Sequence, residues 1–245
     1  MKIVTWNVNG FRALINRDLL GTFNSLNADV YCLQETRLQA GDGGVDLPGY
    51  HEYWNYAQRK GYAGTALITL RKPLGVYCGL GIEPFDSEGR LITADLGDFY
   101  LLNCYTPFAA PDLSRLEERK AWDSALLSLI TQLDQVKPVI LCGDLNAAYN
   151  TADLNGKNQG MHVPGYTAEE RSGLTAILDS GFVDAYRHFH PDNKAGQFAY
   201  RKGIRAVGLD YFIVSERLLP KVSECRVHTR IHGSDHWPLE LTLFE

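Results

Sequence analysis

Short apolar segments recur along the whole chain, and polar or turn-forming residues separate them. The segments are rich in Val, Ile, Leu, Tyr and Phe, and most end at Gly, Pro, Asp or Asn, which is typical of β-strands bounded by turns. This pattern predicts strands over residues 2–7, 29–34, 64–70, 91–96, 99–105, 138–142, 210–214 and 239–243.

Amphipathic segments lie between some of the predicted strands. Apolar residues near helical spacing predict helices over residues 11–26, from about 114 onward, and over 167–178. Ser114 with Glu117 and Thr167 with Glu170 each fit a capping box at the start of a helix, and Gly181 is expected to end the third helix. Many strands with a few long helices indicate an α/β fold in which two packed sheets carry helices on their outer faces.

No low-complexity segment, charge block or Pro/Ser-rich linker divides the 245 residues, so we expect one domain over residues 1–245. No apolar run approaches the roughly 18 residues that a membrane span requires, and the early polar residues argue against a signal peptide. Five cysteines without a CxxC pair are typical of buried, reduced thiols in a cytoplasmic protein: Cys32, Cys78, Cys104, Cys142 and Cys225.

Charge does not decide whether the partner is a nucleic acid. The chain has 24 Lys and Arg residues against 29 Asp and Glu residues, a net charge of −5, whereas nucleic-acid-binding proteins usually show a basic surface. A site that collects carboxylates for a metal ion lowers the net charge, and a local basic rim is compatible with an acidic total.

Polar residues gather where the predicted strands end. They are Asn7, Asn9, Gln34, Glu35, Tyr105, Asp144 and Asn146, together with segment 233–236, which contains Asp235 and His236. If these strands are neighbours, their ends converge on one rim that carries carboxylates, carboxamides, a phenol and an imidazole.

These residue types suit the hydrolysis of a phosphodiester. Mg²⁺ prefers oxygen ligands and usually takes only one or two protein carboxylates, so Glu35 is a natural ligand and Asn9 can add an oxygen. Asp144 can orient or deprotonate the attacking water, and Asn146 and His236 can donate to the phosphoryl oxygens.

A second carboxylate beside His236 would keep its imidazole charged near neutral pH. A carboxylate hydrogen-bonded to His236 would raise its pKa, and Asp210, at the start of a predicted strand, is a candidate. Each piece alone has a plain structural alternative, because Asp-x-Asn after a strand is usually a turn, Asp-His is often a surface pair, and Glu35 can cap the next segment. The repetition of such clusters beside apolar runs is what favours a site.

Eight motifs, in order, make the sequence similar to the exonuclease III / apurinic endonuclease family of DNA-repair nucleases. They are WNVNG (6–10), LQET (33–36), GYAGTA (61–66), EGRLI (88–92), YTP (105–107), GDLN (143–146), LDYF (209–212) and GSDHWP (233–238), and they span nearly the whole chain. The resemblance implies a four-layer α/β sandwich with the active site at one edge of its two sheets.

The resemblance also implies a role for each residue of the rim. Glu35 would be the principal metal ligand, with Asn9 and Asp235 nearby, and the metal would be Mg²⁺, with Mn²⁺ as an alternative. Asp144 would prepare the attacking water, and Asn7 and Asn146 would hold Asp144 and the phosphate. Tyr105 would bind the phosphate. His236, oriented by Asp210, would stabilise the transition state. Arg90, in the EGR motif, would be structural, DNA-facing or both.

The departures from the family lie mostly on the substrate side. Phe108 replaces a phosphate-contacting Asn after YTP, and Tyr149 replaces a His after GDLN. In the pocket for a flipped-out abasic sugar, the polar Gln197 and the smaller Val207 stand where the family has an aromatic and a bulky residue. Because the shape of this pocket selects the base-free sugar, these changes are expected to alter selectivity. Phe108 either packs within its loop or stacks on a nucleobase.

The expected DNA contacts are mostly basic residues. They are Arg59, Lys60, Arg115, Arg119, Arg201, Lys202 and Arg205, together with Tyr62, Phe108 and Gln197. Each charge has the alternative of being merely solvated, and the cluster 201–205 is favoured because it lies beside the altered pocket.

The sequence therefore indicates a monomeric, Mg²⁺-dependent DNA-repair nuclease that acts on double-stranded DNA with abasic sites or recessed 3′ ends. Its activity would be that of a 3′→5′ exonuclease, an abasic-site endonuclease or a 3′-phosphatase. One alternative is a phosphodiesterase with the same core that acts on RNA, a nucleotide, or a phospholipid or inositol phosphate. Another is a DNA-binding protein without catalysis, against which the complete set of rim residues argues.

Overall fold

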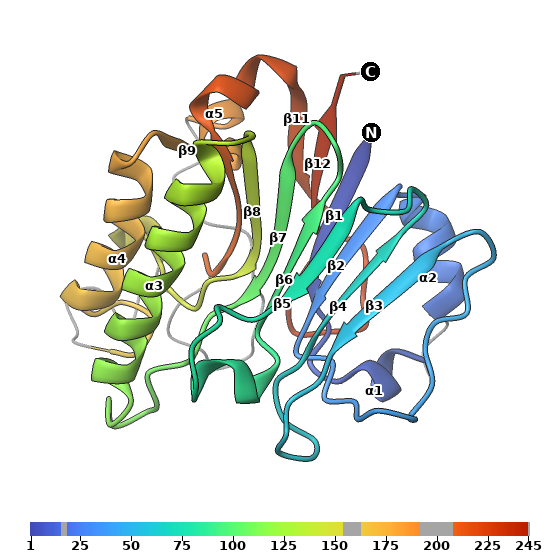
Figure 1. The fold of residues 1–245 in the computed structure, drawn as a ribbon, viewed down its shortest axis with the longest axis horizontal. Helices are drawn as coiled ribbons and strands as arrows, with labels where there is room; N and C mark the ends of the chain where they lie inside the picture. Colours follow the sequence, from blue (N-terminus) through green and yellow to red (C-terminus); the bar gives the residue numbers. More distant parts are fainter. Residues whose placement is uncertain (16–18, 154–162, 192–207, 245) are drawn as a thin grey trace.

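Two six-stranded sheets form the centre of the computed structural model, which describes residues 1–15, 19–153, 163–191 and 208–244 (Figure 1). The first sheet has the order β11-β12-β1-β2-β4-β3, with β1 Lys2–Asn7, β2 Val30–Gln34, β3 His51–Asn55, β4 Thr65–Thr69, β11 Val222–Val227 and β12 Leu239–Leu243. The second has the order β5-β6-β7-β8-β10-β9, with β5 Gly75–Cys78, β6 Leu91–Asp95, β7 Tyr100–Tyr105, β8 Val139–Asp144, β9 Phe182–Asp184 and β10 Asp210–Ser215.

The two sheets share one plan. Each has a parallel pair at its centre, β1 with β2 in the first and β7 with β8 in the second. The other neighbours are antiparallel. Because parallel strands end at the same edge, each sheet presents two strand ends side by side.

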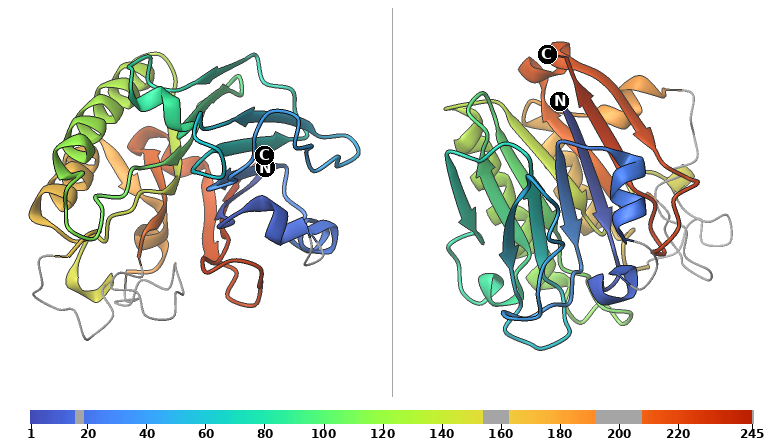
Figure 2. Two further views of the ribbon diagram at one scale, coloured as in Figure 1. Left: turned by 90° about the horizontal axis from the view of Figure 1, so that it is seen from below. Right: turned by 90° about the vertical axis from the view of Figure 1, so that its right-hand side faces the viewer.

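Helices cover the outer face of each sheet, as Figures 1 and 2 show. The helices are α1 Phe11–Ile15, α2 Leu19–Leu26, α3 Leu116–Asp134, α4 Ala168–Asp179 and α5 Ala185–Phe189, with 3₁₀ turns Phe85–Glu88, Thr151–Asp153 and Glu216–Lys221. Apolar side chains such as Ile3 and Phe212 fill the space between the sheets. A second cluster joins Phe11 of α1 to Leu33 of β2, and a third joins Trp122 of α3 to Ile213 of β10. The predicted four-layer α/β sandwich is confirmed.

The sequence pattern found the interior strands and missed the edges. All eight predicted segments are strands, and they are the four central strands of each sheet. The missed strands β3, β5, β9 and β11 are the four edge strands. Edge strands are partly exposed and so lack the continuous apolar run that marks a buried strand. His51–Asn55, for example, has no buried residue, whereas every residue of Val30–Gln34 is buried.

The helix starts were predicted with mixed success. The capping box at Thr167 and Glu170 is confirmed, since both of its hydrogen bonds are present. The capping box at Ser114 is wrong: helix α3 begins at Leu116, and the Ser114 hydroxyl donates to Asp112 at 2.7 Å instead. The predicted helix over 11–26 consists of α1 and α2, with residues 16–18 outside the described part of the chain.

All five cysteines are free thiols, and four of them are buried. Cys78 is the exception to the predicted burial, because it lies exposed on the edge strand β5. Among the described residues, no helix is long and apolar enough to cross a membrane.

Several residues expected to contact DNA lie outside the described residues, as does the variant pocket position: Gln197, Arg201, Lys202, Arg205 and Val207.

Candidate active site

The predicted rim forms at one end of the sandwich, where strands of both sheets terminate. Asn7 ends β1 opposite Gln34, which ends β2. In the second sheet, Tyr105 ends β7 opposite Asp144, which ends β8. The antiparallel strand β10 begins at the same place, so Asp210 is the register partner of Asp144. The topology alone therefore brings carboxylates from separate strands to one edge.

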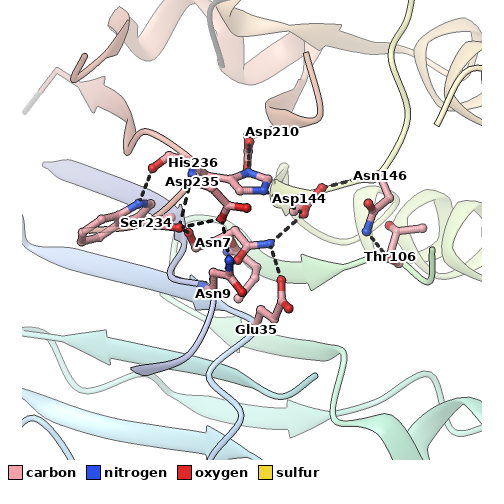
Figure 3. A network of polar contacts seen from close by, with 12 residues as sticks. Asn7, Asn9, Glu35, Thr106, Asp144, Asn146, Asp210, Ser234, Asp235 and His236 are labelled. Carbon is pink, nitrogen blue, oxygen red and sulfur yellow. Dashed lines mark hydrogen bonds and ion pairs between the residues drawn. The ribbon is translucent and has the colours of Figure 1, made fainter. Parts of the chain in front are cut away.

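Asn7 joins the two sheets across this rim, as Figure 3 shows. Its amide nitrogen donates to Asp144 Oδ2 at 2.8 Å and to Glu35 Oε2 at 3.1 Å. Its amide oxygen accepts from the backbone N–H of Asn9 at 3.0 Å, and Asn9 in turn donates to Asp235 Oδ1 at 2.9 Å. One buried carboxamide thus fixes the spacing of two carboxylates and connects them to a third.

His236 is held as a charged group by Asp210. Its Nδ1 lies 2.7 Å from Asp210 Oδ2, and the indole of Trp6 donates to the His236 carbonyl at 2.9 Å. Burial works against the charged imidazolium, but the charge and hydrogen bond of Asp210 outweigh it and raise the pKa of His236 to about 10. The ring therefore carries a proton on both nitrogens at neutral pH. The predicted pairing of Asp210 with His236 is present.

Asp144 sits buried beside this pair, and its environment makes it a proton acceptor near neutrality. Its Oδ1 accepts from the Asn146 backbone N–H at 2.9 Å, and its Oδ2 lies 3.9 Å from His236 Nε2. Burial, reinforced by the charge of Asp210, raises the pKa of Asp144 to about 7. A carboxylate with such a pKa accepts a proton from water more readily than an ordinary aspartate does.

Tyr105 is placed by Arg90. The Arg90 guanidinium carbon lies 4.7 Å from the centre of the Tyr105 ring, and Arg90 Nη1 donates to the Tyr105 carbonyl at 3.0 Å. Arg90 is 2% exposed and forms an ion pair with Glu88 at 2.5 Å. Burial and the nearby charges of Glu35 and Asp144 raise the pKa of Tyr105 well above its usual value, so its phenol stays protonated and can donate. Of the alternatives for Arg90, the structure supports the structural one.

Two acidic groupings at the rim differ in their suitability for a metal ion. Ligand atoms of Asp144, Asp210 and His236 lie within 4.8 Å of one another, so the described residues contain a cluster that could bind a metal. A protonated imidazole repels cations, however, and this favours a hydrogen-bonded role for that cluster. Glu35, Asn9 and Asp235 offer hard oxygen donors, which is the donor set that Mg²⁺ prefers. Their residue types fit a divalent cation.

Arg37 occupies oxygen atoms of two members of this second grouping. Its guanidinium contacts Glu35 Oε1 and Asn9 Oδ1. Arg37 was not among the predicted site residues, although its position directly after LQET was a signal that it would lie near Glu35.

Of the described residues expected to contact DNA, Arg59 and Lys60 are exposed. The others differ in accessibility. Phe108 is 40% exposed, so its ring is accessible. Arg115 is half-buried and engaged by Glu88 at 3.0 Å, while its Nη1 donates to the Tyr62 hydroxyl at 2.8 Å. Arg119 is 2% exposed, which contradicts a direct contact with DNA. Its signal was in the sequence, because it shares the helical stripe of Trp122, Leu126 and Ile130 that faces the core.

Known proteins resemble the chain over its full length. The endonuclease/exonuclease/phosphatase family matches residues 4–236. The chain belongs to this family. It is 43% identical to an exodeoxyribonuclease of Bacillus subtilis, with 99% of each chain covered. It is 39% identical to a DNA-(apurinic or apyrimidinic site) endonuclease of Dictyostelium discoideum, covering 98% of this chain and 69% of that one.

A solved structure shows the same fold. A 3′ phosphatase from Neisseria, bound to a product DNA hairpin, superposes with a TM-score of 0.88 at 24% identity, and the whole of both chains is covered. The endonuclease/exonuclease/phosphatase sandwich is therefore shared at low sequence identity.

Proposed function

We propose that this member of the endonuclease/exonuclease/phosphatase family is a DNA-repair nuclease that hydrolyses phosphodiester bonds with a divalent metal. The observation that carries the proposal is the arrangement in which Asn7 holds Asp144 beside a charged His236–Asp210 pair. The names of the relatives, an exodeoxyribonuclease and an apurinic or apyrimidinic site endonuclease, support DNA as the substrate.

Glu35 would hold the metal, Mg²⁺ or alternatively Mn²⁺, with Asn9 and Asp235 beside it. The metal would supply charge that polarises the phosphoryl oxygens. Because the Arg37 guanidinium contacts Glu35 and Asn9, metal binding requires Arg37 to leave these oxygens.

The side chains of the chain itself would perform the proton and charge steps. Asp144 would accept a proton from the attacking water, and Asn7 would keep its carboxylate aimed at that water. His236 Nε2 faces Asp144 across 3.9 Å, which is longer than a hydrogen bond, so its proton remains available to a phosphoryl oxygen. Asn146 and the protonated phenol of Tyr105 would add donors to the phosphate, where preorganised donors are most effective.

The substrate would be double-stranded DNA with abasic sites or recessed 3′ ends. The exposed ring of Phe108 would stack on a base beside the site, where such stacking is worth roughly 1–3 kcal/mol. Gln197, Val207 and the cluster 201–205 would shape the sugar pocket and contact the backbone, as predicted above. We further propose that the enzyme acts as a monomer in the cytoplasm. RNA is the second substrate to test, since the catalytic groups do not themselves distinguish the sugar.

Asp144→Asn tests the proposal most sharply. The amide keeps the shape of the side chain but cannot accept the proton, so hydrolysis should fall by roughly 10²–10⁴-fold. Binding to a DNA duplex should be retained or should tighten, because the change removes a negative charge facing the phosphate. Single-turnover cleavage and binding of the same labelled duplex measure both quantities.

Asp98→Asn is the matched control. Asp98 is an exposed aspartate in a hollow that Met1 also lines, at the end of the sandwich where β1 begins. Asp144 instead faces Asn7, where β1 ends. It should cleave and bind like the unchanged protein. Turnover by Asp144→Asn at the unchanged rate would contradict the assigned role, and loss of binding together with cleavage would point to a folding defect.

A further inference from the structure

Arg119 is a buried charge beneath the active site. It lies in the second turn of α3, only 2% exposed, in the layer that covers the second sheet. Burying a guanidinium is costly unless its donors are matched. The hydrogen-bond partners of this side chain therefore indicate its role, and most of them belong to the loops of the active site.

Three backbone carbonyls and one carboxylate satisfy the guanidinium. Its Nη1 donates to the carbonyls of Pro107 and Asn146, each at 3.2 Å, and its Nη2 donates to the carbonyl of Leu145 at 2.8 Å. Its Nε donates to Asp123 at 2.9 Å, which balances the charge within α3. A second carboxylate, that of Glu170 on α4, lies 3.8 Å away.

The three carbonyls come from the two loops that carry the chemistry. Pro107 follows Tyr105 at the end of β7, and Leu145 and Asn146 follow Asp144 at the end of β8. These strands are parallel neighbours, so their loops leave the sheet side by side. One guanidinium therefore connects both loops to the same helix.

The connection continues to the reactive groups. Asn146 has a left-handed backbone (φ 48°), which a residue other than glycine rarely adopts without support. In this conformation its backbone N–H reaches Asp144 Oδ1 at 2.9 Å, and its side-chain amide donates to the Thr106 carbonyl at 2.8 Å. Arg119 fixes the carbonyl of the same residue, and so it restrains the donor that orients Asp144.

We propose that Arg119 is a positioning residue of the nuclease, which aligns Asp144 and Tyr105 by clamping the loops that follow β8 and β7. This inference rests on the proposed function, because it assigns Arg119 to the same hydrolysis. A planar guanidinium fork suits this task, since it directs several donors to fixed acceptors at once. Lysine carries the same charge but cannot reproduce the fork.

The test compares Arg119→Met, Arg119→Lys and Leu126→Ala. Leu126 lies on the same buried stripe of α3 and is not one of the residues assigned to the site, so its truncation controls for lost stability. The melting temperature of each variant is measured first. The single-turnover rate and the dissociation constant for one duplex with a recessed 3′ end are then measured at a temperature below the melting temperature of every variant that folds.

Arg119→Met should lower the single-turnover rate by at least roughly tenfold, because small displacements of reacting groups are costly, while the dissociation constant changes less than about threefold. Arg119→Lys should fold more readily and give an intermediate rate, which keeps the test decisive if the methionine variant fails to fold. Leu126→Ala should lower the melting temperature but keep the rate.

Equal rates for the Arg119 variants and Leu126→Ala would overturn the proposal. Weaker DNA binding with an unchanged rate would also overturn it, in favour of a role in binding. Absence of cleavage by the unchanged protein, of this duplex and of one with an internal abasic site, would instead mean that the proposed function is wrong, so the two failures are distinguishable.

Discussion

The two ends of the sandwich are built from the same strands but differ in what they do with polar groups. At the end where β1, β2, β7 and β8 terminate, Asp144, Asp210 and His236 are buried and matched to one another. At the end where these strands begin, a hollow of about 550 Å³ is lined by apolar residues such as Phe99, and its charged neighbours Arg71, Asp98 and Lys221 are exposed.

The two ends differ in whether their charged groups are buried or in contact with water. Charges that remain in water interact weakly with one another, because solvent and salt screen them. Burial beside other charged groups changes the pKa of a side chain, as the pKa values of about 7 for Asp144 and about 10 for His236 illustrate. Under the proposed function, one end is specialised for reaction and the other for packing, and mutations can test that division.

The largest effect in this comparison is expected from His236→Ala. Loss of a charged donor that stabilises the transition state should lower the rate roughly 10²–10³-fold. His232→Ala is the matched control, since His232 is an exposed histidine four residues earlier. A rate loss for His236→Ala below about tenfold, or roughly 1.4 kcal/mol, would refute the assigned role.

Glu35→Gln should have an intermediate effect and should act through the metal. The amide keeps the size of the side chain but loses the charge, so the Mg²⁺ concentration at half-maximal rate should rise at least roughly tenfold. Calorimetric titration of Mg²⁺ or Mn²⁺ into the protein without DNA should show the same weakening. Glu117→Gln on the surface of α3 is the control, and equal metal affinity in both variants would rule out Glu35 as the ligand.

Phe99→Ala, at the opposite end, should change the rate least. Phe99 is 5% exposed in the core between the sheets, so its truncation should cost about 3–5 kcal/mol of unfolding free energy. The rate per folded molecule should stay the same, as urea denaturation and cleavage assays on one sample can establish. A large loss of rate in fully folded Phe99→Ala would show that the two ends are coupled.

The interior of the fold and most of the rim could be predicted from the sequence, because both leave local signals. Central strands read as continuous apolar runs, and the rim residues stand directly after them. The edge strands could not be predicted in this way, since a strand such as Gly75–Cys78 is half exposed and has no such run.

The contacts between the sheets could not be predicted from local pattern at all. Asn7 and Asp144 are 137 positions apart, and their hydrogen bond exists only because two sheets pack with their strand ends aligned. The sequence pattern favoured a DNA contact for Arg119 because basic residues usually face solvent, whereas tertiary packing placed it beneath the loops. Its place on an apolar helical stripe outweighed its charge.

Cleavage of two labelled DNA duplexes with Mg²⁺ at one salt concentration tests the central claim most directly. One duplex carries a single internal abasic site, and the other is undamaged with a recessed 3′ end. We expect metal-dependent hydrolysis that a chelator abolishes. The abasic site should be incised if Gln197 and Val207 leave a usable pocket, and digestion should start from the 3′ end alone if they do not. Folded protein that cleaves neither duplex would contradict the account.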